Sequence, residues 1–242
     1  MALILFGGAI LQGTVGFGMG MFSIPLLVWS GLSLPQAIAA TLPAVLVQSS
    51  FNCWQHREHL PWKPAITLFV LRASTVPLGI WLLSMMVEWD PSRIKQMIGA
   101  FLLTALATIW AVKPTPVPKV RAGWTIFAGT LSGTLVGLVG MGGPPVSLWV
   151  LAHDWPPITK RCCLWLSFLM LLPFHAAMLV WQFGSPLFQS LVTATVVAPA
   201  TILGAIVGAK LGSQLNAKGL RIAMLSLLLF IAVRALVAPW FG

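Results

Sequence analysis

Two glycine-rich clusters, each inside a long apolar run, constrain the fold of this chain more than any other feature. The first cluster covers residues 12–20 (QGTVGFGMG) and the second covers residues 137–145 (GLVGMGGPP). A glycine in a helix interior costs up to about 1 kcal/mol and lets other groups approach the backbone closely. We therefore expect the chain to break at both clusters.

The composition places these clusters in a membrane. Hydrophobic residues make up 58% of the 242 residues, and charged residues only 7%, whereas soluble domains carry about 25% charged residues. The sequence therefore predicts an all-α polytopic membrane protein whose surroundings are the lipid bilayer. The formal net charge of +10 does not indicate nucleic acid, because the basic residues lie in short connections between apolar segments and not on one face.

Eight apolar segments can be distinguished. They cover residues 2–29, 36–54, 64–86, 94–112, 124–151, 161–182, 186–209 and 219–240. Six of them have the length of one transmembrane helix, which needs about 20 residues. The segments that contain the glycine clusters have 28 residues each, and a straight helix of that length would be about 42 Å long against a hydrocarbon core of about 30 Å. Each is therefore predicted to form a broken hairpin that enters the membrane and turns back.

The two clusters also mark an internal repeat. A shift of 124 residues aligns residues 15–20 with residues 139–144, and Gly79 then aligns closely with Gly204. A shift of 122 residues aligns Leu34-Pro35 with Pro156-Pro157. We therefore expect a single transmembrane domain over residues 1–242, with repeat 1 at residues 1–112, a proline-rich linker at 113–123 and repeat 2 at 124–242.

The distribution of basic residues predicts the topology. If both long segments re-enter, ten of the Lys and Arg residues in the connections fall on one side and two on the other. If all eight segments span, the division is seven to five, which is no bias. Cytoplasmic loops hold the excess of Lys and Arg, so the re-entrant arrangement is favoured. Three spans per half then make the halves inverted repeats, with both termini on the outer side.

Inverted repeats with broken helices are a recurrent transporter design. Half-helix N-termini at the breaks present free N–H groups and partial positive charge, which suits an anion. We expect substrate contacts from the cluster residues, and from polar groups nearby that could instead hold helices together. The candidate site residues are Gly16, Phe17, Gly18, Gly20, Gly140, Met141, Gly142, Gly143, Pro144, Gln48, Arg72 and His175.

The positions of the ionisable residues argue against a cation as the substrate. All four carboxylates, at Glu58, Glu88, Asp90 and Asp154, lie in connections, so a cation substrate is disfavoured. No cofactor, resident metal or catalytic residue is expected. The alternative is a membrane-embedded enzyme or assembly factor acting on sulfur or metal. The adjacent cysteines Cys162-Cys163 and the loop with His56 and His59 would support that alternative.

The two clusters carry a family resemblance. Residues 13–20 and 137–145, about 124 residues apart in a chain of this length, resemble the paired motifs of the TauE/SafE family of sulfite and organosulfur exporters. The resemblance covers the whole chain. It implies a carrier in the bacterial inner membrane for small anions such as sulfite or sulfoacetate, coupled to the proton gradient. We expect a monomer or homodimer.

Overall fold

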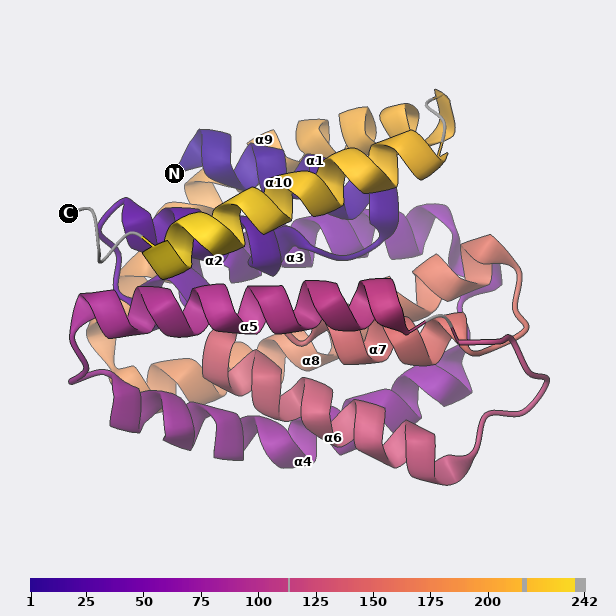
Figure 1. Cartoon of the computed structure of the whole chain (residues 1–242), viewed down its shortest axis with the longest axis horizontal. Coiled ribbons are helices and arrows are strands. Elements are labelled where there is room, and N and C mark those ends of the chain that lie inside the picture. Colours follow the sequence, from indigo (N-terminus) through magenta and orange to yellow (C-terminus); the bar gives the residue numbers. More distant parts are fainter. Residues whose placement is uncertain (113, 215–216, 238–242) are drawn as a thin grey trace.

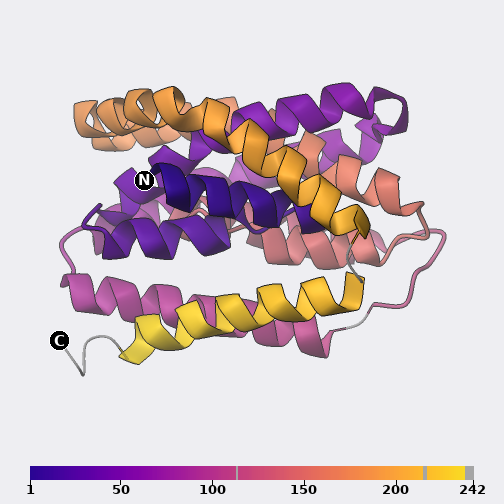
Figure 2. The same cartoon turned by 90° about the horizontal axis from the view of Figure 1, so that it is seen from above.

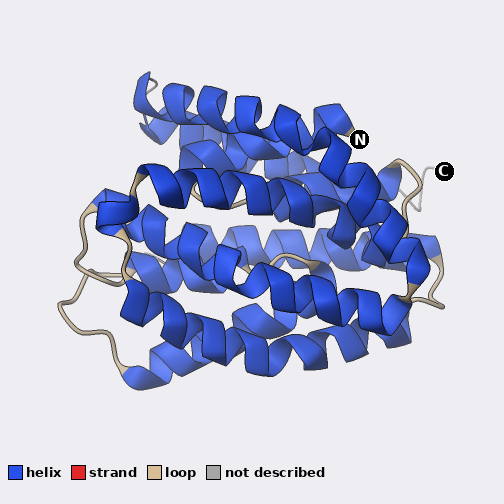
Figure 3. Cartoon of the chain, turned by 180° about the vertical axis from the view of Figure 1, so that it is seen from behind, coloured by secondary structure: helices blue, strands red, loops and turns tan. Residues whose placement is uncertain are grey.

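The computed structural model describes residues 1–112, 114–214 and 217–237, and every named element in these ranges is helical, as expected (Figure 3). The helices are α1 (Ala2–Val15), α2 (Met19–Trp29), α3 (Leu34–Gln55), the 3₁₀ turn η1 (Arg57–His59), α4 (Trp62–Met86), α5 (Pro91–Ala111), α6 (Ala122–Val139), α7 (Gly143–Leu151), α8 (Pro157–Phe183), α9 (Ser185–Gln214) and α10 (Ala217–Val237). Each apolar segment therefore forms one helix or one pair of helices.

Local chemistry explains several of the helix starts. Helix α3 begins with a capping box, in which the Ser33 hydroxyl accepts from the Gln36 N–H and the Gln36 side chain accepts from the Ser33 N–H. Helix α5 begins after Asp90, whose carboxylate accepts from the Ser92 N–H at 2.7 Å. These caps stabilise helix ends that lie outside the apolar segments.

The two glycine clusters interrupt the helices as predicted. Helix α1 is capped by Gly16, which follows its last residue and has φ 93°, and α2 begins after Gly18, which has φ 110°. Helix α6 is capped in the same way by Gly140, which has φ 71°, and α7 begins after Gly142. Only glycine adopts such left-handed conformations at low cost. The chain reverses at both breaks, so α1 and α2 form a first hairpin and α6 and α7 form a second (Figure 1).

The two hairpins open toward opposite ends of the molecule. The start of α1 and the end of α2 lie at one end, together with the connections that follow α4 and α8 (Figures 1 and 2). The start of α6 and the end of α7 lie at the other end, together with the connections that follow α3 and α5. The connections that we expect to be cytoplasmic therefore gather at one end. The inverted relation of the halves remains a prediction.

The lengths of the hairpin helices differ from the expectation. Within the described ranges, α3, α4, α5, α6 and α8 are long and apolar enough to cross a membrane, and α9 adds a sixth candidate that is bent by 58° near Pro199. Helix α6 was expected to be half of a re-entrant segment, but it has 18 residues and α7 only 9. The second hairpin is unequal because α6 begins at residue 122, just before the segment, and the break itself takes residues 140–142 from the second arm. Within α10, residues 225–237 form an apolar helix that is shorter than a membrane span.

The helix contacts between the two halves occur as equivalent pairs. Helix α4 of the first half packs along α6 of the second, and α9 of the second half packs along α1 of the first. Likewise, α3 packs on α9, and α8 packs on α4, while α5 pairs with α10 and α3 with α8. The aligned glycines occupy equivalent crossings, since Gly79 faces α6 and Gly204 faces α1. The halves therefore interlock.

Small residues allow the closest of these contacts. A methyl group at Gly137 would lie 2.8 Å from the Ile80 nitrogen and 2.9 Å from the Gly79 Cα. Both neighbours belong to the α4 backbone, which cannot move aside as a side chain can. Close backbone approach through small residues is a common way to hold helices together in membranes.

We therefore expect Gly137→Ala to destabilise the protein. Overpacking of this kind costs about 1–3 kcal/mol, which lowers the melting temperature by roughly 2–4 °C per kcal/mol for a chain of this size. Gly123→Ala in the first turn of α6 is the matched control, because nothing lies within 4 Å of the added methyl group. Thermal unfolding in detergent, followed by tryptophan fluorescence, measures both. Equal melting temperatures would contradict the prediction.

Candidate functional site

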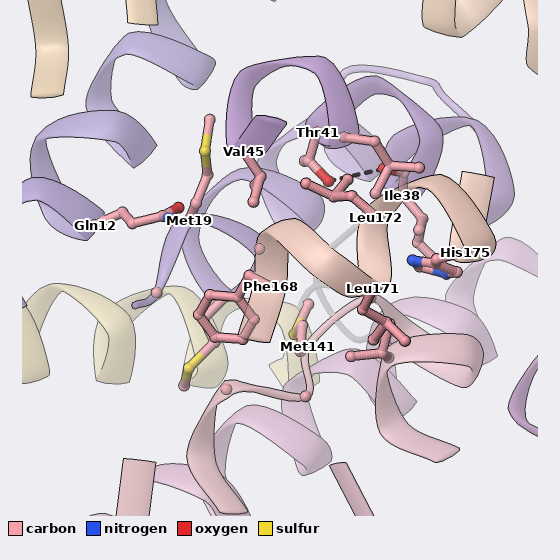
Figure 4. A pocket seen from close by; sticks show the side chains of 18 of the residues that line it. Gln12, Met19, Ile38, Thr41, Val45, Met141, Phe168, Leu171, Leu172 and His175 are labelled. Atoms are coloured by element: carbon pink, nitrogen blue, oxygen red, sulfur yellow. Dashed lines mark hydrogen bonds between the residues drawn. The ribbon is translucent and has the colours of Figure 1, made fainter. Parts of the chain in front are cut away.

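A cavity of about 80 Å³ lies where the two hairpin breaks meet. Its walls come from the break between α1 and α2, the break between α6 and α7, and from α3, α4 and α8 (Figure 4). One buried water needs about 10–15 Å³ of such space. This central cavity therefore has room for several waters or one small polyatomic solute.

Direct contact of the two breaks shapes the cavity. A Cβ atom at Gly20 would lie 2.7 Å from the Gly140 carbonyl oxygen, so only glycine permits this approach. Gly18 has open space beside its Cα, because nothing lies within 4 Å of the place that a Cβ atom would take. The glycines therefore serve two purposes. Gly20 and Gly140 let the two breaks come into contact, and Gly18 leaves room inside the cavity.

The half-helix N-termini differ in what they offer. Neither Gly18, before α2, nor Gly142, before α7, supplies a side-chain cap, and the first N–H groups of a helix have no partner within it. Pro144 and Pro145 remove two of these donors from α7. The Ser132 hydroxyl also holds the Gly142 carbonyl at 2.6 Å. Helix α2 is therefore the richer N–H donor, and α7 contributes mainly its dipole.

Arg72 on α4 brings a fixed cation to the cavity wall. Its side chain is 1% exposed. One terminal nitrogen donates to the Ser167 carbonyl at 3.0 Å and to the Ser167 hydroxyl at 3.3 Å, and the guanidinium carbon lies 5.0 Å from the centre of the Phe168 ring. Its Nε has no partner. These contacts hold the guanidinium in place and leave one buried donor unused.

Two further polar side chains reach the cavity without partners. The Gln12 Nε2 and the His175 Nε2 are buried and make no hydrogen bond. They lie on opposite sides of the cavity (Figure 4). A buried polar group left unpaired costs about 1–3 kcal/mol, so native structures rarely keep one without a ligand or water. Gln12, Arg72 and His175 together can therefore bond to water or to a solute inside the cavity.

The charge of the wall selects the sign of that solute. Among the lining residues, Arg72 is the one cation, and no carboxylate takes part. All four carboxylates of the chain lie on exposed residues in the connections. An uncompensated buried cation favours an anion strongly at this depth.

Most of the predicted site residues converge on this cavity. Eight of the twelve line it, namely Gly18, Gly20, Arg72, Gly140, Met141, Gly142, Gly143 and His175. Gly16, Phe17, Pro144 and Gln48 do not line it. Gly16 ends α1 beside Arg161, and Phe17 packs against Gly143. Gln48 donates to the Ala9 carbonyl at 3.0 Å, so it joins α3 to α1. Whether the eight bind substrate remains a prediction.

The cavity also includes residues that the sequence did not single out as site residues. Gln12 belongs to the first cluster, and its position in that motif was the available signal. Thr41 on α3 and Phe168 on α8 also line the wall, and nothing in their sequence context distinguishes them from core residues. The helical phase of α3 and α8 decides which of their faces reaches the cavity.

The three cysteines and the loop with His56 and His59 do not line the central cavity. Cys53, Cys162 and Cys163 are free and buried, and the Cys162 thiol lies 3.9 Å from the His56 carbonyl oxygen. The described part of the chain has no group of three or more His, Cys, Asp or Glu residues that could hold a metal ion.

Comparison with known proteins agrees with this picture. The model of the family "Sulfite exporter TauE/SafE" matches residues 1–235. A probable sulfite/organosulfonate exporter TauE from Cupriavidus necator is 25% identical over 206 residues, which cover 83% of this chain and 80% of that protein. A probable membrane transporter protein from Methanocaldococcus jannaschii is 22% identical over 241 residues, which cover 90% and 88%. No solved structure matches the chain.

Family match, helical architecture and a cavity between two broken hairpins lead to one conclusion. The chain belongs to the TauE/SafE family of membrane transporters.

Proposed function

We propose that this transporter carries small sulfur-containing anions of the sulfite or sulfonate type. The observation that carries the proposal is the set of unpartnered buried nitrogens of Gln12, Arg72 and His175 around a cavity without a carboxylate. A sulfite or sulfonate group has three oxygens that accept hydrogen bonds, and it is small enough for the central cavity. The printed function of the Cupriavidus necator relative, a probable sulfite/organosulfonate exporter, supports the same class.

The transport mechanism that we propose is alternating access between inverted repeats. The cavity is formed by elements of both halves, so a movement of one half against the other would open it to one side and close it to the other. The repeated helix pairing and the opposite orientation of the two hairpins support this proposal (Figure 1). The glycine contact between Gly20 and Gly140 would be remade in each cycle.

Coupling to the proton gradient is the third part of the proposal. His175 is the one imidazole in the cavity wall, and its Nε2 has no partner. Imidazole is the side chain whose charge changes most readily near neutral pH. A proton on His175 would add a second positive charge beside the anion, and its loss would weaken anion binding. Protonation of His175 and binding of the anion would thereby be linked.

We further propose that the protein lies in the bacterial inner membrane with both termini on the outer side. The end of the molecule at which α6 begins and α7 ends would then be cytoplasmic. The distribution of Lys and Arg among the connections supports this orientation.

Gln12→Leu tests the binding site. Leucine matches glutamine in size but lacks the unpartnered donor, and a hydrogen bond to a charged group contributes about 1.5–3 kcal/mol. We expect the KM for sulfite flux into proteoliposomes to rise by roughly 10–100-fold. Gln12→Glu should reduce flux further, because it adds a negative charge. Gln189→Leu on the exposed face of α9 is the matched control. Wild-type KM values for both Gln12 variants would refute the site.

His175→Gln tests proton coupling. Glutamine keeps a hydrogen-bonding side chain but cannot carry the proton, so flux down an anion gradient should persist while a pH gradient no longer drives accumulation. Sulfite uptake and an internal pH dye, recorded together in proteoliposomes, measure the two. The control is His59→Gln at an exposed position. Accumulation driven by a pH gradient in the His175 variant would exclude this residue as the coupling group.

Cysteine labelling tests the orientation. Ser33 and Ser185 are exposed at the end proposed to face outward, and Lys119 is exposed in the linker at the other end. The three native cysteines are buried. We expect a membrane-impermeant maleimide to label Ser33→Cys and Ser185→Cys in intact cells, and Lys119→Cys only after permeabilisation. The reverse pattern would invert the topology.

A further inference from the structure

A second cavity of about 260 Å³ lies beside the central one. It is enclosed by the tip of the first hairpin, by α7, by the start of α8, and by the pair α5 and α10. Its walls are mostly apolar, with side chains such as Leu106, Leu148 and Leu228. Because the start of α8 forms part of its wall, the cavity lies toward the end of the molecule at which α8 begins.

The tip of the first hairpin separates the two cavities. Gly18 and Met21 line both of them, so one thin segment of chain forms the partition. Phe17 lines the second cavity and packs against Gly143, where a Cβ atom would lie 3.2 Å from the phenyl ring. The two cavities are therefore adjacent at this tip.

Two cations lie in the wall of the second cavity. Lys160 and Arg161, in the first turns of α8, are half-buried, and no hydrogen bond or ion pair of either side chain is recorded among the described residues. The stem of Arg161 packs against Gly16, 3.6 Å from a Cβ position there. These cations therefore stay uncompensated where the hairpin tip meets the cavity.

Their field reaches the neighbouring connections. Burial lowers the pKa of His153, and Lys160 adds to the effect. Burial also lowers the pKa of His56, with smaller contributions from His59 and Arg161. Lys160 and Arg161 therefore act on both histidines, which lie in the connections at this end of the molecule.

The basic pair has no counterpart in the other half. The alignment that places Leu34-Pro35 on Pro156-Pro157 places Ile38-Ala39 on Lys160-Arg161. Ile38 and Ala39 are fully buried in the apolar core. The repeat therefore accounts for helix α8 but not for the charges of Lys160 and Arg161, which have no equivalent in α3.

We propose that the second cavity is the vestibule through which the anion reaches the central cavity from the end where α8 begins, and that Lys160 and Arg161 collect it there. This inference rests on the proposed anion transport. Apolar walls offer the anion few hydrogen bonds, so it keeps its water shell and is not held. Clustered charge at the mouth of a low-dielectric cleft raises the local concentration of the opposite charge. Tight binding then falls to the donors of the central cavity.

The first test is the variant Lys160→Gln/Arg161→Gln. We expect its KM for sulfite, added from the side where α8 begins, to rise about tenfold with little change in maximal flux, and its KM to lose most of its dependence on ionic strength. The control Arg57→Gln/Lys63→Gln removes the same charge from exposed positions at the same end. A KM equal to that of the control would overturn the proposal, and the swap Lys160→Arg/Arg161→Lys should retain the wild-type KM.

The second test requires no flux, so it remains informative if sulfite is not the substrate. Ser147 lines the vestibule, and Ser147→Cys can be placed in a background without the three native cysteines. We expect an anionic sulfonatoethyl methanethiosulfonate to label it faster than the cationic trimethylammonium reagent, and the Lys160→Gln/Arg161→Gln change to reduce that preference about tenfold. Equal rates, or no reaction because a lipid chain fills the space, would contradict the proposal.

Discussion

A helix that breaks inside a bilayer leaves backbone N–H and C=O groups that lipid cannot satisfy, and the architecture of this protein depends on that constraint. Both breaks are enclosed by protein, because the two halves interlock through α4 with α6 and α1 with α9. The carbonyl of Gly142 is bonded by the Ser132 hydroxyl. The first residues of α2, Met19, Gly20 and Met21, line the central cavity. The same packing that shelters the breaks thus creates the site.

The buried guanidinium of Arg72 gives that site its sign. Removing such a charge from water is costly unless it is paired, yet its recorded bonds go only to the Ser167 carbonyl and hydroxyl oxygens. Phe168 adds an aromatic face. These contacts fix the position of the charge without neutralising it. An anion in the central cavity would complete the arrangement.

Sequence reasoning was strongest where local chemistry decides the outcome. The breaks at Gly16 and Gly140 follow from glycine clusters inside runs too long for one crossing, and the burial of Arg72 follows from its position within an apolar segment. It was weaker where helical phase matters. Phe17 and Pro144 adjoin residues that line the central cavity but do not line it themselves, and Gln48 bonds to α1 instead. The unequal lengths of α6 and α7 also depend on packing, because glycine marks a break without setting its distance from either end.

By itself, the sequence determined the membrane class, the all-helical architecture and the two breaks, since composition and glycine content act locally. Only the tertiary structure decided which donors lack partners. A side chain such as Gln12 or His175 can be called unsatisfied only when every neighbour from other helices is known. The second cavity likewise arises where the tip of the first hairpin, α5 and α10 meet the consecutive helices α7 and α8, and packing brings these distant parts of the sequence together.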